Sequence, residues 1–173
     1  MQFRVDQRFA ATPDDVLAMY CTAEFYDALD ELTRIGRPEV LSVDGGPSDR
    51  TVRLRVRYAF TGHLPGAALA VIDPKKLTWV EDTSFDTATR TGTTKLLPDH
   101  YPDRLTASAR STIKGVEPAD DAGEPRTVRR VEGTVSVRMP FVGGQVEKAI
   151  VSGLRDHLAD EQLVATRWLR GER

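Results

Sequence analysis

The clearest pattern in the chain is an alternation of apolar and polar side chains between residues 51 and 60. The even positions are all apolar, and the odd positions are mostly arginine or threonine. A period of two is typical of a strand with one buried face and one solvated face. Because only one face is apolar, the pattern predicts an antiparallel sheet that is covered on one side.

Weaker alternation predicts further strands on both sides of this segment. They are expected at residues 2–10, 39–44, 77–85, 93–97, 104–116 and 126–139. Clusters of Gly, Pro, Asp and Ser separate several of them, as hairpin turns require. We therefore expect the strands to pair mainly with their sequence neighbours, and residues 118–125 to form a polar, mobile turn.

Helical spacing appears early in the chain and again at its end. Thr12 provides an N-cap hydroxyl before Pro13 and two acidic residues, which predicts a helix over 13–20. A second short helix is expected to follow through Leu32. From residue 143 to 170, apolar side chains recur every three or four positions. This spacing predicts a final helix of roughly 25 residues, about 38 Å long.

The order of these elements predicts an α+β fold with its helices on one face of the sheet. The long helix would cover the apolar face of a curved antiparallel sheet. Since a straight helix does not fill all the space beneath a curved sheet, we expect a cavity between them. No repeat or linker divides the chain, so residues 1–173 are expected to form one domain.

Charge and composition narrow the range of partners. The 24 basic and 26 acidic residues give a formal net charge of -2, without the basic excess of a nucleic-acid-binding domain. The apolar runs are far shorter than the ~20 residues that span a bilayer. With one cysteine and no apolar stretch typical of a signal peptide at the start, the chain is expected to be cytoplasmic. We expect no nucleic-acid partner, no integral membrane association, and a monomer or homodimer.

One segment resembles a known superfamily. The junction Val137-Arg138-Met139-Pro140-Phe141-Val142-Gly143-Gly144-Gln145-Val146-Glu147, the closing Trp168-Leu169 and the element order are similar to those of START-like, Bet v 1-like (SRPBCC) helix-grip proteins. Within them, the chain resembles the actinobacterial family DUF2505, a domain of unknown function. The resemblance implies a cavity for a lipid, polyketide or other apolar small molecule. It implies no catalytic residues, because the superfamily shares no catalytic motif.

The candidate ligand-binding residues are the inward-facing positions of the strands and the long helix. They are Val52, Leu54, Val56, Tyr58, Phe60, Trp79, Glu81, Phe85, Val146, Ile150, Leu154 and His157. Glu81 could bind a polar ligand head or act as a base, or a bulge could turn it outward. His157, with Glu161 one turn later, could transfer protons or lie at the helix surface. The remaining positions could also be ordinary core.

No metal or cofactor is expected, because the three histidines show no ligand spacing with carboxylates. Cys21 has no obvious base nearby, which favours a buried structural thiol. The sequence thus favours a noncatalytic carrier or sensor of an apolar small molecule. Two alternatives stay open. One is a cyclase-like or hydrolytic enzyme that uses Glu81, Tyr58 or His157, and the other is a protein-interaction module with an exposed apolar patch.

Overall fold

The computed structural model describes residues 1–30, 32–61, 66–69, 73–116 and 126–172. In these ranges, seven strands form one antiparallel sheet in the order β1-β7-β6-β5-β4-β3-β2. The strands are β1 (Gln2–Phe9), β2 (Glu39–Asp44), β3 (Thr51–Ala59), β4 (Thr78–Asp86), β5 (Thr91–Pro98), β6 (Leu105–Gly115) and β7 (Thr127–Val137). From β2 to β7 each strand pairs with its sequence neighbour, as predicted. β1 instead pairs with β7 from the other end of the chain.

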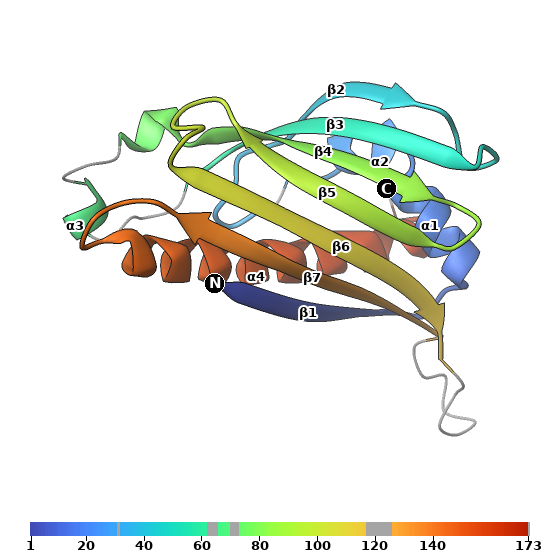
Figure 1. The fold of residues 1–173 in the computed structure, drawn as a ribbon. Helices are drawn as coiled ribbons and strands as arrows, with labels where there is room; N and C mark the ends of the chain where they lie inside the picture. Colours follow the sequence, from blue (N-terminus) through green and yellow to red (C-terminus); the bar gives the residue numbers. More distant parts are fainter. Residues whose placement is uncertain (31, 62–65, 70–72, 117–125, 173) are drawn as a thin grey trace.

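The helices lie on one face of the curved sheet (Figure 1). They are α1 (Pro13–Tyr20), α2 (Ala23–Asp27), α3 (Gly66–Leu69), the 3-10 turn η1 (Pro74–Lys76) and α4 (Gly143–Leu169). Figure 1 shows α4 running the length of the sheet, with α1 and α2 near its C-terminal end. This arrangement is the predicted α+β helix-grip fold. None of the described helices is long and apolar enough to cross a membrane.

The start of α1 follows the sequence signal, whereas α2 is shorter than predicted. The Thr12 hydroxyl accepts a hydrogen bond from the Asp15 backbone N–H at 3.2 Å, as an N-cap residue should. α2 ends at Asp27, so the predicted continuation through Leu32 is wrong. Beyond α2, the Thr33 N–H donates to the Asp160 carboxylate at 2.9 Å, which ties this segment to α4.

A tightly packed core fills the end of the molecule where α1, α2 and the last turns of α4 meet the sheet. Phe25 is fully buried and makes edge-to-face contacts with the rings of Tyr20 and Trp168 at centroid distances of 5.2 and 5.9 Å. Val52 and Leu54 of β3 belong to the same core. This end of the fold therefore leaves little free space between sheet and helices.

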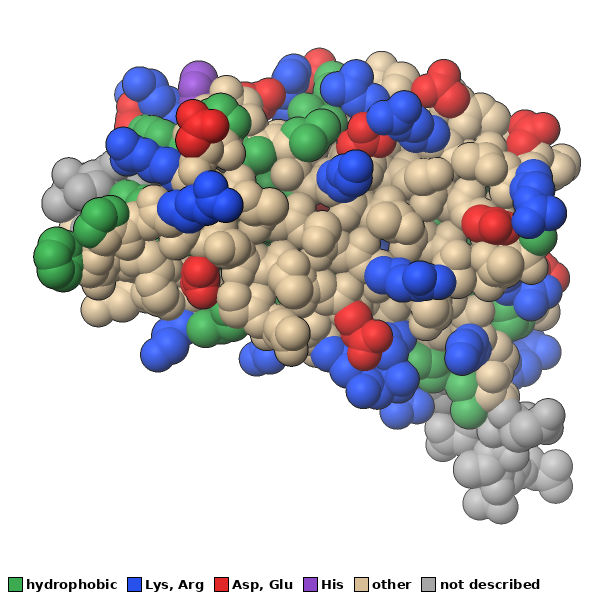
Figure 2. All heavy atoms as spheres, viewed as in Figure 1, with side chains coloured by type: hydrophobic (Ala, Val, Ile, Leu, Met, Phe, Trp, Pro, Cys, Tyr) green, Lys and Arg blue, Asp and Glu red, His purple; other side chains and the backbone are tan. Residues whose placement is uncertain are grey.

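The opposite face of the sheet carries charges of both signs (Figure 2). Several are paired across strands, including Arg53 with Asp82 and Arg130 with Asp6. Exposed pairs of this kind stabilise a protein by about 0–1 kcal/mol. The described part of the chain thus places its apolar side chains against the helices, as the alternation in β3 predicts. The predicted turn at 118–125 lies outside the described residues.

Candidate ligand-binding site

A cavity of about 260 Å³ separates the sheet from the N-terminal half of α4. Val146, Ile150 and Leu154 are four residues apart on α4, so they present one continuous stripe to this space. Most of the other lining side chains are also apolar. They are Ile35, Phe60, Leu77, Trp79, Leu96, Pro98, Leu105, Val137, Met139 and Ala149. We call this space the main cavity.

Polar side chains lie where the main cavity meets solvent. Lys76, His100 and Arg104 line the cavity and are exposed. Arg34 also lines it, and its guanidinium pairs with Asp156 at 2.9 Å. Among the described residues, no Asp or Glu contributes to this wall. The opening is therefore basic, while the interior is apolar.

A second, smaller cavity of about 70 Å³ lies next to the main one. Leu96 and Leu154 line both spaces, so the two cavities are adjacent at these side chains. The walls of this small cavity differ in chemistry, because four ionisable side chains face it. They are Glu81, Arg129, His157 and Glu161.

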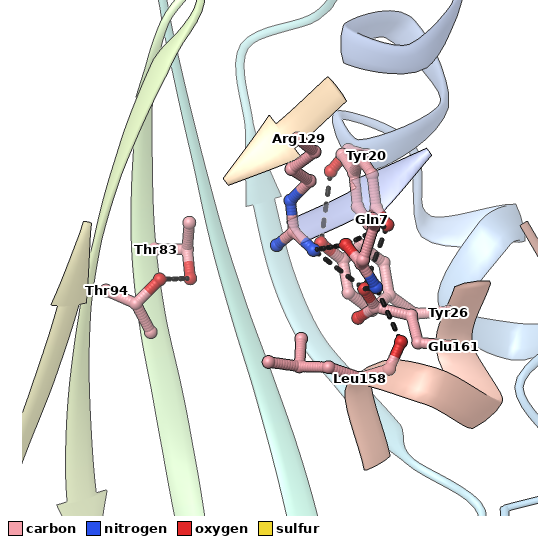
Figure 3. A network of polar contacts seen from close by, with 8 residues as sticks. All are labelled: Gln7, Tyr20, Tyr26, Thr83, Thr94, Arg129, Leu158 and Glu161. Carbon is pink, nitrogen blue, oxygen red and sulfur yellow. Dashed lines mark hydrogen bonds and ion pairs between the residues drawn. The ribbon is translucent and has the colours of Figure 1, made fainter. Parts of the chain in front are cut away.

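Arg129 and Glu161 belong to a buried polar network (Figure 3). Arg129 Nη1 donates to Glu161 Oε1 at 2.8 Å and to Gln7 Oε1 at 2.6 Å. The Tyr20 hydroxyl donates to the same Glu161 oxygen at 2.8 Å, and its ring lies 4.0 Å from the Arg129 guanidinium carbon. Gln7 Nε2 donates to the Leu158 carbonyl oxygen at 2.6 Å. Burial opposes ionisation of Glu161, but Arg129 and its other partners hold the pKa of Glu161 below its usual value.

Glu81 and His157 are much less well paired. Glu81 accepts one long hydrogen bond, from Trp79 Nε1 at 3.4 Å. Burial raises the pKa of the Glu81 carboxyl, and the nearby His157 and Trp79 offset this only in part. His157 is 4% exposed, and its Nδ1 atom has no hydrogen-bond partner among the described residues. Its ring packs edge-to-face on Tyr58 at 5.5 Å. Both groups thus face the small cavity with unused hydrogen-bonding capacity, as does Arg129 through its Nε, which has no partner among the described residues.

The structure distributes the twelve candidate residues over three environments. Phe60, Trp79, Val146, Ile150 and Leu154 line the main cavity. Glu81 and His157 line the small cavity, together with Leu154. The remaining five are buried but border neither cavity. They are Val52, Leu54, Val56, Tyr58 and Phe85. These inward side chains instead pack in the core that contains the buried residues of α1 and α2.

The network residues Gln7, Tyr20 and Arg129 were not among the candidates. Two of them had a signal in the sequence, because Gln7 and Arg129 occupy inward positions of alternating strands, where apolar residues are expected. A polar side chain on the apolar face of a strand must find a partner or face a polar space. Tyr20 gave no such signal, since a tyrosine at the end of a short helix is ordinary core.

The described residues contain no group of three or more His, Cys, Asp or Glu side chains that could hold a metal ion. Cys21 is buried, and burial raises the pKa of its thiol to about 12. A thiol with so high a pKa is a poor nucleophile at neutral pH.

Structural comparison shows the same fold in distant proteins. The crystal structure of TTHA0849 from Thermus thermophilus has a TM-score of 0.64 at 15% identity, and the match covers 99% of this chain and 98% of that one. Norcoclaurine synthase from Thalictrum flavum, in complex with dopamine and hydroxybenzaldehyde, has a TM-score of 0.59 at 15% identity. This match covers 100% of this chain and 88% of the synthase. A START superfamily protein from Mycobacterium smegmatis has a TM-score of 0.55 at 18% identity, with 98% of this chain and 97% of that protein covered. At these identities the likeness establishes the fold alone.

Sequence comparison is more specific. No curated protein is significantly similar to the chain. The family described as "Protein of unknown function (DUF2505)" matches residues 4–169, which is nearly the whole chain and confirms the resemblance noted from the β7–α4 junction. The chain therefore belongs to the DUF2505 family, and its fold is the START-like, Bet v 1-like helix-grip fold.

Proposed function

We propose that this protein binds an apolar small molecule in the main cavity, as a carrier or sensor and without catalysis. The observation that carries the proposal is the cavity itself, which is lined mostly by apolar side chains between β-strands and α4. Ligand sites are concave, mostly apolar and largely preformed, with a few polar groups that fix orientation. The norcoclaurine synthase complex, in which the same fold holds two aromatic compounds, adds support.

The volume of the main cavity limits the size of the ligand. At about 260 Å³ it lies just below the ~300–1,000 Å³ of most ligand pockets. It exceeds the ~150 Å³ of an engineered cavity that binds benzene. A compound larger than one six-membered ring, such as a bicyclic molecule or a medium-length acyl chain, matches this space.

The first test is native mass spectrometry of gently purified protein, followed by denaturation and organic extraction. A stoichiometric apolar compound released from the protein would support the proposal. If the protein is recovered free of ligand, thermal-shift assays with medium-chain fatty acids and bicyclic aromatic compounds replace the search for a co-purified compound. Stabilisation by none of these probes would argue against ligand binding.

Gly153 allows a sharper test of where such a ligand binds. It lines the main cavity, and a Cβ atom added there would meet nothing within 4 Å. Gly153→Phe should therefore fill the cavity without straining the helix, since Gly is the poorer helix former by up to ~0.5 kcal/mol. Binding should fall at least tenfold while the melting temperature holds or rises.

Gly144 provides the matched control on the same helix. An added Cβ there is equally free of contacts, but Gly144 is exposed and borders neither cavity. Gly144→Phe should leave binding unchanged. Equal binding by wild type and Gly153→Phe would place the ligand elsewhere and remove the basis of the proposal.

A second candidate function, proton-transfer catalysis, has one observation in its favour. Glu81 and His157 both face the small cavity, whereas Tyr58 contacts His157 without lining that space. The test is conversion of an extracted ligand. Product formed in excess of protein by wild type, and lost in His157→Phe, would establish catalysis; ligand recovered unchanged would exclude it for that compound.

An interaction module finds less support. The large hydrophobic side chains that are exposed in the described part of the chain come from separate segments. They are Met1, Leu69, Leu97, Val116, Phe141 and Leu163. An interface would require several hundred Å² of contiguous apolar surface.

A further inference from the structure

We infer that the small cavity is a head-group subsite that selects an uncharged ligand bearing a hydroxyl group, as in an alcohol or a phenol. The inference rests on the proposed function, because it requires an apolar ligand in the main cavity. Leu96 and Leu154 line both cavities, so one end of that ligand would lie next to Glu81 and His157.

The unpaired groups of the small cavity call for a polar ligand atom. His157 is 4% exposed, and its Nδ1 has no partner in the described part of the chain. Within the described ranges, the Glu81 carboxyl accepts only the 3.4 Å hydrogen bond from Trp79. A hydroxyl both donates and accepts, so it can bond with both groups whichever of them carries the proton. It would thereby satisfy polar groups that are otherwise costly to bury.

The charges around the small cavity argue against an ionised head group. Arg129 is already neutralised by Glu161, its ion-pair partner at 2.8 Å. A carboxylate head would add a negative charge beside Glu81 and Glu161. An ammonium head would lose its hydration among Leu96, Leu154 and other apolar walls. Burying an unpaired charge costs far more than burying a hydroxyl.

The basic opening of the main cavity does not reverse this preference. Lys76, His100 and Arg104 are exposed there. Charge interactions at exposed sites are weak, about 0–1 kcal/mol, and are screened by salt. Contacts with the half-buried Glu81 and the buried His157 should therefore discriminate more strongly between head groups than contacts at the opening.

The test compares four probes with the same eight-carbon chain: 1-octanol, 1-methoxyoctane, octanoate and octylammonium. Affinities are measured by isothermal titration calorimetry at physiological salt. The ether matches the alcohol but cannot donate a hydrogen bond. We expect 1-octanol to bind about 3- to 10-fold more tightly than 1-methoxyoctane, the ratio that one hydrogen bond supplies, and more tightly than either charged probe.

Variants assign this preference to the small cavity. Glu81→Leu and His157→Phe should each bring the alcohol-to-ether ratio close to one, and the phenylalanine keeps a ring against Tyr58. Glu81→Gln keeps a hydrogen-bonding group in place and should retain the preference. Glu132→Leu is the matched control, because Glu132 is exposed and borders neither cavity. It should behave as wild type.

The outcomes separate this inference from the proposed function. Binding of all four probes with no preference for the alcohol would overturn the head-group subsite and leave the apolar cavity intact. Tightest binding of octanoate would assign head recognition to the basic residues, and tightest binding of octylammonium would assign it to ionised Glu81. Either result overturns the inference. Failure of all four probes to bind would overturn both proposals.

Discussion

Arg129 and Arg130 are adjacent on β7, and the structure predicts very different consequences for the same substitution at each. Arg129 faces inward with an 11% exposed side chain, paired with the 6% exposed Glu161. Arg130 faces outward with a 39% exposed side chain and binds Asp6 through two hydrogen bonds of 2.8 and 3.0 Å. Methionine approximates the length of arginine without its charge.

Arg129→Met should destabilise the protein by about 3–5 kcal/mol, because it leaves the Glu161 carboxylate buried without its counter-charge. For a chain of this length, that corresponds to a fall in melting temperature of about 6–20 °C. Arg130→Met should cost at most about 1 kcal/mol, since it removes an exposed pair. Urea denaturation followed by far-UV circular dichroism measures both free energies of unfolding.

A double variant tests the reason as well as the magnitude. If the cost arises from an uncompensated charge, Arg129→Met combined with Glu161→Leu should be more stable than Arg129→Met alone. An Arg129→Met protein as stable as Arg130→Met would refute the reasoning, as would a double variant in which the two losses simply add.

Two further predictions concern pH and packing. Because the pKa of Glu81 is raised in the folded state, the folded protein binds a proton at this carboxyl more tightly than the unfolded chain does. The stabilisation from this proton is present below about pH 4.5 and is lost as pH rises through the raised pKa. In urea titrations, Glu81→Gln should therefore become more stable relative to wild type as pH rises from 4 to 8. A difference in unfolding free energy that does not change with pH would contradict the raised pKa. Glu161 has a lowered pKa, so its contribution is lost as pH falls below about 4.5. Gly133→Ala should destabilise by about 1–3 kcal/mol, because the added Cβ would lie 2.5 Å from the Ser108 carbonyl oxygen and 2.7 Å from the Phe3 ring. Gly144→Ala, with no such contact, should leave stability unchanged. Thermal unfolding of both variants measures the difference.

The strands and the long helix could be predicted because each has a local cause in the sequence. In β3, apolar side chains at every second position can be buried together only on one face, and Val52 and Leu54 are indeed almost fully buried. The spacing of Val146, Ile150 and Leu154 likewise defines one face of α4. The end of α2 at Asp27 could not be predicted, because the helical spacing continues through Leu32. The segment beyond α2 is held by a contact between Thr33 and Asp160, which are more than a hundred residues apart.

The location of the cavity could be predicted only in part for a similar reason. Alternation identifies which side chains point inward, but the distance from the sheet to α4 decides whether they meet a cavity or other side chains. Val52 lies in β3 and Phe60 directly follows that strand in the same alternation, yet only Phe60 borders the main cavity. Val52 instead meets the packed core to which the aromatic residues of α1 and α2 belong.

The polar network explains why the cavity ends where it does. Along α4 the lining side chains run from Val146 to Leu154, His157 and Glu161 then face the small cavity, and Val164 belongs to the packed core. Glu161 is held by Arg129, Tyr20 and Gln7, so displacing it would expose a buried charge. Along α4, the small cavity therefore lies between the main cavity and the packed core, with Glu161 at its inner limit. In the proposed function, the ion pair that stabilises the fold would also set the inner limit of the ligand-binding site.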